Sequence, residues 1–387
     1  MARSKVYVNS VGMTTIADHW GLSILDLAVE ASKGALKGFG KTKPDHIIVG
    51  NMFSAVGARQ EHLGAMVADG LGLSGTPAFK VEAACSSGGS AFNVGFNLVR
   101  SGAIDSALVV GVEKMRDLEP EEVSSALAMA ESAEYTQFVG ATFAALNGLL
   151  ARYYMEKYDV SRDELSSIPV IDHLNAVTAS HAQFRKAITP EVVSRSAMIA
   201  DPLRLFDCAP VGDGAAAVLL VNEHAASGTK RKMAEVLGGR IATNEFSIYE
   251  RDDILDFKST RLAFRGALEQ AGLAPGKISL VELHDAFSVV GALALEAMGY
   301  SKRGKGSKDA KEGRYGRGSD LPINTFGGLK ARGHPVGATG MYQIAEAYLQ
   351  LTDQAGKNQV EGAQYAATQN IGGVDTTAAV HVLGRAS

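Results

Sequence analysis

Two stretches of the chain carry the same predicted order of elements, and this repeat constrains the fold more than any other feature. Each reads as strand, helix, strand, small-residue turn, helix and strand. In the first stretch we predict strands over 46–52, directly before Cys85 and over 106–113, and a helix over 90–101. In the second stretch we predict strands over 279–283 and 365–369, helices over 289–298 and 340–351, and a small-residue turn over 327–334. This order builds a mixed or parallel sheet with helices on its faces, so we expect an α/β fold made of two related halves.

Cys85 stands where the first stretch turns from strand to helix. The segment VEAACSSGGS leads from β-branched residues through a small-residue turn into the apolar run 91–99. A helix N-terminus favours thiolate over thiol, and glycines allow a substrate carbonyl to approach the backbone. Cys85 is therefore a candidate nucleophile. The alternative, a buried cysteine that acts as a small hydrophobic residue, stays open on this motif alone.

His334 occupies the corresponding place before the helix of the second stretch. A pseudo-two-fold axis between the halves would bring the two helix N-termini together, and with them a thiol and an imidazole. A thiol nucleophile needs such a base to take its proton. The repeat thus predicts that Cys85 and His334 meet.

Residues 118–207 differ from both halves in their sequence pattern, which is helical, charged and rich in Met. They form either an extra helical cap or, as we favour, a lid over the site.

Composition excludes several classes of function. A net charge of −4 gives no support for nucleic acid or a membrane surface as partner, and two cysteines allow neither a disulfide framework nor a cysteine-rich metal site. The remaining histidines lack ligand spacing, so we expect no metal. The N-terminus does not resemble a signal peptide, and no apolar run reaches the length of a membrane span. We therefore expect a cytoplasmic protein.

Four motifs, in this order, carry a family resemblance: Cys85 in AACSSG, His284 in HDAF, His334 in KARGHPVGATG and Asn370 in NIGG. With them the chain resembles the thiolases, and more narrowly the archaeal and sterol-carrier-protein-associated branch. The resemblance implies a layered αβαβα fold of two pseudo-two-fold halves plus a loop domain. The implied division is 1–117 with 208–240 for the N-terminal half, 118–207 for the loop domain and 241–387 for the C-terminal half.

The resemblance also implies an activity, acetyl-CoA C-acyltransferase, in which two acetyl-CoA give acetoacetyl-CoA and CoA. Cys85 would carry the acyl group, and His334 would take its proton. One oxyanion hole would use backbone N–H groups of Cys85 and of Gly372 and Gly373, and the other would use His334 with His284 or with a water that His284 holds. Coenzyme A thioesters would be substrates, with no tightly bound cofactor.

The chain departs from the family where a second cysteine serves as base for the α-proton. The two customary positions hold Asn370 and Ala286, which cannot accept a proton at neutral pH. His284 could be the base, or a water or the substrate thiolate could replace it, and Cys208 is a less favoured candidate. Other chemistry would also fit, namely decarboxylating condensation or retro-aldol cleavage of a CoA ester. A non-catalytic acyl-CoA-binding scaffold is the alternative outside catalysis.

The resemblance further implies a homodimer or homotetramer. Related proteins work beside hydroxymethylglutaryl-CoA synthase and a small zinc-ribbon/OB-fold partner, which suggests a place in isoprenoid synthesis.

Overall fold

The computed structural model describes residues 4–41, 43–229 and 231–386, and its centre is a nine-stranded sheet in the order β3-β2-β4-β7-β1-β8-β11-β10-β9. The strands are β1 (Val6–Met13), β2 (His46–Gly50), β3 (Ala78–Val81), β4 (Ser106–Glu113), β7 (Gly214–Asn222), β8 (Ala234–Thr243), β9 (Leu280–Glu282), β10 (Tyr365–Gly372) and β11 (Thr377–Arg385). Two short strands, β5 (Met198–Ala200) and β6 (Leu203–Arg204), pair separately.

The strand order is the same in both halves when each is followed toward the middle of the sheet. The N-terminal half reads β2-β4-β7-β1 and the C-terminal half reads β9-β10-β11-β8, each with one parallel pair followed by antiparallel pairs. The halves join through β1 and β8, where Tyr7 pairs with Glu235 and Val8 with Ala234. This arrangement confirms the predicted repeat.

The strand arrangements of the two halves differ at one strand. In the N-terminal half, β3 pairs in parallel with β2 and leads to Cys85. In the C-terminal half, a single parallel bridge between Val281 and Ile323 takes its place. The turn that carries His334 is therefore held outside the sheet, by backbone hydrogen bonds from the Gln183 and Phe184 amides and by side-chain contacts of Arg332.

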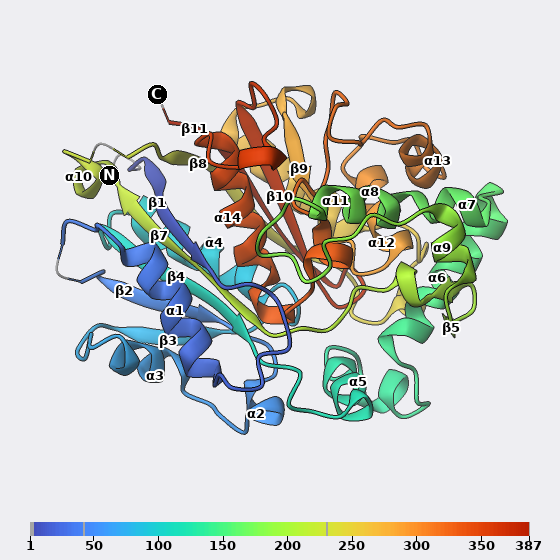
Figure 1. Ribbon diagram of the computed structural model, residues 1–387, viewed down its shortest axis with the longest axis horizontal. Coiled ribbons are helices and arrows are strands. Elements are labelled where there is room, and N and C mark those ends of the chain that lie inside the picture. Colours follow the sequence, from blue (N-terminus) through green and yellow to red (C-terminus); the bar gives the residue numbers. More distant parts are fainter. Residues whose placement is uncertain (1–3, 42, 230, 387) are drawn as a thin grey trace.

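Helices α4 (Ser87–Arg100) and α14 (Thr339–Leu351) lie between the two halves of the sheet (Figure 1). One apolar core joins them to strands of both halves, including Val109 of β4 and Leu383 of β11. Their N-terminal turns cross so closely that a Cβ on Gly340 would lie 2.3 Å from the backbone nitrogen of Gly89. Only glycine permits this contact.

The outer faces are covered by α1 (Ile24–Leu36) and α3 (Leu63–Gly70) on the N-terminal half and by α11 (Lys258–Ala271) and α12 (Ser288–Ala297) on the C-terminal half. The layers therefore run α, β, α, β, α, as expected. Ser23 begins α1 with a capping box to Asp26.

The segment 118–207 lies beside the C-terminal half and shares its core with α12 (Figure 1). The remaining helices are α2 (Ser54–Gly57), α5 (Pro120–Ala128), α6 (Phe143–Tyr158), α7 (Arg162–Leu165), α8 (Ser167–Ala176), α9 (Pro190–Arg195), α10 (Glu223–Ala226) and α13 (Gly306–Lys311). The division into three domains stays a prediction. Among the described residues, no helix has the length and apolar character needed to span a bilayer.

Candidate active site

A cavity of about 80 Å³ brings together Cys85, His284 and His334, the three predicted catalytic side chains. Gly373 lines it as well. The other walls are mainly apolar and come from both halves and from the segment 118–207: Met115, Leu127, Phe143, Pro210, Val211, Phe257, Phe287, Val290, Val336 and Val374. A larger cavity of about 970 Å³ beside α2 and α5 contains none of the three.

A tight turn presents Cys85 between β3 and α4. Ala84, just before it, has a left-handed backbone with φ of 50°. The Ser87 hydroxyl braces the turn, because it accepts from the Ala83 amide at 2.9 Å and donates to the Ala84 carbonyl at 2.6 Å. The end of β10 packs against the same turn, and a Cβ on Gly372 would lie 2.3 Å from the Ala83 oxygen. Glycine at 372 thus lets β10 reach the nucleophile.

Burial, rather than the helix N-terminus, decides the ionisation of Cys85. The side chain is 8% exposed, and burial with the nearby Glu113 carboxylate raises the thiol pKa to about 12. The helix N-terminus was expected to favour the thiolate, but the pKa of Cys85 shifts in the opposite direction, since desolvation outweighs the helix dipole. The nucleophile rests as a thiol and needs a base at the moment of attack.

His334 is a neutral imidazole, the form that can act as this base. Thr339 Oγ1 donates its only proton to the Pro335 carbonyl at 3.1 Å, so it accepts a hydrogen bond from His334 Nδ1 at 2.6 Å. The proton of the neutral ring is thereby assigned to Nδ1, which leaves Nε2 as an acceptor without a hydrogen-bond partner among the described residues. Burial, with the neighbouring His284 and Arg332, holds the pKa of His334 well below its usual value.

His284 has the opposite tautomer. Its Nδ1 lies 3.1 Å from Asn370 Nδ2, which can only donate, so the proton of the neutral ring lies on Nε2. Burial and Arg332 lower its pKa to about 3. The rings of His284 and His334 stand edge to face, with centroids 5.1 Å apart. The site therefore combines one free imidazole acceptor and one imidazole donor.

Asn370 organises these groups. Its Nδ2 also donates to the Cys85 carbonyl at 3.1 Å, and its Oδ1 accepts from the Gly89 amide in the first turn of α4 at 3.1 Å. One amide thus ties the nucleophile turn, α4 and His284 together.

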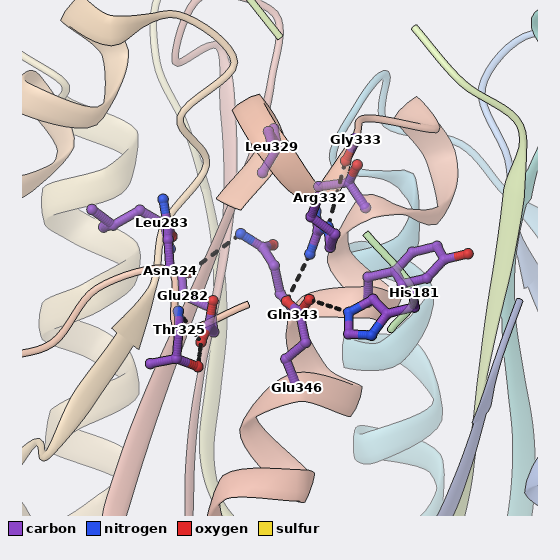
Figure 2. Close-up of polar contacts among 12 residues, drawn as sticks. His181, Glu282, Leu283, Asn324, Thr325, Leu329, Arg332, Gly333, Gln343 and Glu346 are labelled. Atoms are coloured by element: carbon purple, nitrogen blue, oxygen red, sulfur yellow. Dashed lines mark hydrogen bonds and ion pairs between the residues drawn. The ribbon is translucent and has the colours of Figure 1, made fainter. Parts of the chain in front are cut away.

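Buried charges support the turn that carries His334 (Figure 2). Arg332 is fully buried and its Nη1 donates to Glu346 Oε2 of α14 at 2.7 Å. His181 Nε2 lies 2.8 Å from the other oxygen of Glu346. Because α14 also carries Thr339, this ion pair and the Thr339 contact fix the segment on both sides of His334.

A second cysteine does not line the cavity. The Cys208 thiol donates to the Arg204 carbonyl at 3.4 Å, and burial with the neighbouring Asp207 raises its pKa to about 12. Ala286 lines the cavity but carries no ionisable group. Among the described residues, Asp375 is the one carboxylate on the lining, and its oxygens accept bonds from Ser259 and Thr260 at the start of α11.

Sequence reasoning missed Thr339, Asp375 and Asn147 of the cavity region. Thr339 stands five residues after His334 in the motif KARGHPVGATG, so this motif could have identified it. Asp285, the residue after His284, has a structural role, because its carboxylate accepts from the amides of Leu329 and Lys330.

The high pKa of Cys85 predicts a steep pH dependence of alkylation. Iodoacetamide should modify Cys85 about tenfold faster per pH unit between about pH 6 and pH 9, because the thiolate fraction grows tenfold per unit below the pKa. Mass spectrometry of the labelled peptide measures the rate. A rate independent of pH over this range would instead indicate a preformed thiolate–imidazolium pair.

Two family models match the chain: "Thiolase, N-terminal domain" over residues 6–224 and "Thiolase C-terminal domain-like" over residues 241–385. The acetyl-CoA acetyltransferase of Methanothermobacter thermautotrophicus is 41% identical over 382 residues, which cover 98% of this chain and 99% of that protein. Sterol carrier protein 2 of Homo sapiens is 30% identical, with 95% of this chain and 70% of that protein covered. Among solved structures, the Ltp2-ChsH2(DUF35) aldolase shares the fold, with a TM-score of 0.86, 22% identity and coverage of 99% of this chain and 98% of that one.

Proposed function

The chain belongs to the thiolase family, and from this premise we propose that it forms and cleaves 3-ketoacyl-CoA through a thioester on Cys85. The main reaction converts two acetyl-CoA into acetoacetyl-CoA and CoA, as the name of the Methanothermobacter relative suggests. The observation that carries the proposal is the pairing, in one apolar cavity, of a buried thiol with an imidazole whose Nε2 is free to accept its proton.

In the first half-reaction, His334 Nε2 takes the thiol proton while Cys85 Sγ attacks the thioester carbonyl. The bond between that carbonyl carbon and the CoA sulfur then breaks, and CoA leaves with the proton from His334. Backbone N–H groups of Cys85 and Gly373 stabilise the oxyanion at the turn where Gly372 allows close approach. The acetyl group stays on Cys85, and His334 is again neutral.

In the second half-reaction, a base removes the α-proton of another acetyl-CoA, and the carbanion attacks the carbonyl carbon of the acetyl group on Cys85. The bond between that carbon and Cys85 Sγ then breaks, acetoacetyl-CoA leaves, and the Cys85 sulfur regains its proton from the protonated base. We assign this base to His334, whose Nε2 is free once CoA has left. The Nε2–H of His284 then donates to the enolate oxygen, because Asn370 occupies its other nitrogen. The tautomer favours this role for His284 over the role of base.

The size of the cavity supports an acetyl donor. A volume of about 80 Å³ accommodates a two-carbon acyl group, and the bulky side chains Phe143, Phe257 and Val290 are part of its lining. We therefore place short acyl-CoA thioesters first among the substrates.

Incubation with acetyl-CoA tests the proposal. Intact mass should show one acetyl group per chain, and acetoacetyl-CoA with CoA should give acetyl-CoA. Absence of both results would contradict acyl transfer and leave a binding scaffold. Product formation from malonyl-CoA with release of carbon dioxide, but not from acetyl-CoA, would indicate decarboxylating condensation.

Replacing His284 separates the two half-reactions. His284→Ala should retain acetylation of Cys85 but lower thiolysis of acetoacetyl-CoA about 10²–10³-fold, because an oxyanion donor is lost. His284→Asn, whose amide can donate but cannot serve as a base, should recover part of the loss. Single-turnover acetylation and steady-state thiolysis measure the two effects.

Equal activity of His284→Ala and His284→Asn would contradict the donor role. Normal thiolysis in His284→Ala would remove His284 from the mechanism altogether.

We extend the proposal to the oligomeric state and to the enzyme that would use the product. The edge strand β3 has one side unpaired in the sheet and lies next to the Cys85 turn, which supports a homodimer or homotetramer formed at that edge.

Condensation of two acetyl-CoA is unfavourable, so a consumer of acetoacetyl-CoA is needed. Hydroxymethylglutaryl-CoA synthase, with a small zinc-ribbon/OB-fold partner in the cytoplasm, fits that need.

A further inference from the structure

Glu113 is a buried acidic residue at the C-terminal end of β4 that the mechanism leaves unused. Its exposed fraction is 0%, and it lies outside the lining of the cavity. Its charge nevertheless acts on Cys85, because it is one of the causes that raise the thiol pKa. Burying a carboxylate is unfavourable unless its oxygens are hydrogen-bonded, so its partners indicate its role.

The Glu113 carboxylate connects the two halves of the protein. Its Oε2 accepts from the Met52 amide at 2.9 Å and from the Gly337 amide at 3.0 Å, and its Oε1 accepts from Asn51 Nδ2. Met52 lies just after β2 in the N-terminal half, whereas Gly337 lies three residues after His334 in the C-terminal half. One oxygen therefore ties a loop of one half to the turn that carries the proposed base.

The two tied segments also pack around the nucleophile. Phe53 and Val336, the sequence neighbours of the two tied amides, share one apolar cluster with Cys85. The contact with the turn is close, because a Cβ on Gly337 would lie 2.6 Å from Glu113 Oε2. The carboxylate therefore fixes how near this turn comes to the residues around the thiol.

Proton transfer between a thiol and an imidazole depends on their distance, and here the two groups come from different halves. We infer that Glu113 is a positioning residue, which sets the approach of His334 to Cys85 by holding two backbone amides on one carboxylate oxygen. This inference rests on the proposed function, because it takes His334 as the base for the Cys85 thiol. Glu113 itself takes no part in bond formation or proton transfer.

Two reactions of Cys85 test this role at pH 9, where Glu113, with a pKa raised by burial to about 7, is ionised. Acetylation by acetyl-CoA needs His334, whereas alkylation by iodoacetamide depends on the thiolate fraction alone. Glu113→Asp keeps the charge but is one methylene too short to reach both amides. It should slow acetylation about 10- to 10²-fold and change alkylation by less than about threefold. Intact mass under single-turnover conditions measures both rates.

Glu113→Gln separates the reach of the side chain from its charge. Its Oε1 still reaches both amides, and the lost bond is the one to Asn51, so acetylation should stay within about threefold of the wild-type rate. Alkylation should become about threefold faster or more, because a negative charge near the thiolate is removed. A purely structural role would not reverse the pattern of the two rates between the aspartate and glutamine variants.

Glu296→Asp is the matched control. The Glu296 carboxylate of α12 also accepts from two backbone amides, those of Gly304 and Gly306, but it lies outside the cavity lining. This variant should change neither rate.

The outcomes are distinguishable. Equal slowing of both reactions in Glu113→Asp, or no slowing of acetylation, would overturn the inference while the proposed function stands. Slowing of acetylation in Glu113→Gln as large as in Glu113→Asp would overturn it as well. Absence of acetylation in the wild-type protein would count against the proposed function itself. Gly337→Ala, which pushes the turn away from the same carboxylate, gives the comparison of the two rates if Glu113→Asp does not fold.

Discussion

Replacing Cys85 with alanine is expected to abolish the acetyl adduct and to lower thiolysis by about 10⁴-fold or more. The methyl group cannot form a thioester, and the described side chains on the cavity lining include no second thiol. Incubation with acetyl-CoA followed by intact mass measures the first effect, and consumption of acetoacetyl-CoA measures the second. The variant should fold normally, because alanine fits the space of the buried thiol.

The matched control is Cys208→Ala, which removes the other thiol of the chain. Since the Cys208 thiol faces the Arg204 carbonyl, this variant should keep the adduct and most of the activity. An adduct that survives in Cys85→Ala and disappears in Cys208→Ala would reverse the assignment of the nucleophile.

The second large effect concerns stability. Glu346→Leu should lower the free energy of unfolding by about 3–5 kcal/mol, because it leaves the fully buried Arg332 without its carboxylate. Denaturant unfolding followed by circular dichroism measures the change. Thiolysis should fall as well, since the same ion pair holds the turn before His334 (Figure 2).

Two variants make this prediction specific. Glu269→Leu breaks an exposed ion pair with Arg265 on α11 and should change the stability by less than about 1 kcal/mol. Arg332→Met combined with Glu346→Leu replaces both charges with apolar groups and should recover much of the loss. Equal stability of Glu346→Leu and Glu269→Leu would contradict a structural role for the buried pair.

The repeat explains why the nucleophile and its base could be predicted from sequence. Apolar periodicity located α4 and α14 to within a few residues of their observed starts, and the residues before both helices then had to meet across the axis. The strand predicted over 365–369 was too short, because β10 continues to Gly372 through Asn370, a residue type that is depleted in strands.

The electrostatics of the site could not be predicted in the same way. A helix start after Cys85 suggested a thiolate, whereas the packing of Glu113 and of apolar walls around the thiol reversed the direction of the pKa shift. The tautomers of His284 and His334 follow from Asn370 and Thr339, so they depend on contacts that spacing does not reveal. Asp375 adjoins the glycine turn in sequence, yet it binds the start of α11 more than a hundred residues earlier.

The crossing of α4 and α14 at Gly89 and Gly340 has a consequence for folding. Cys85 precedes one of these helices and His334 the other, so neither half of the chain contains a working pair by itself. During refolding, each half could acquire its strands and helices while the enzyme remained inactive. Recovery of activity therefore reports the docking of the two halves, a later event than the recovery of helix content.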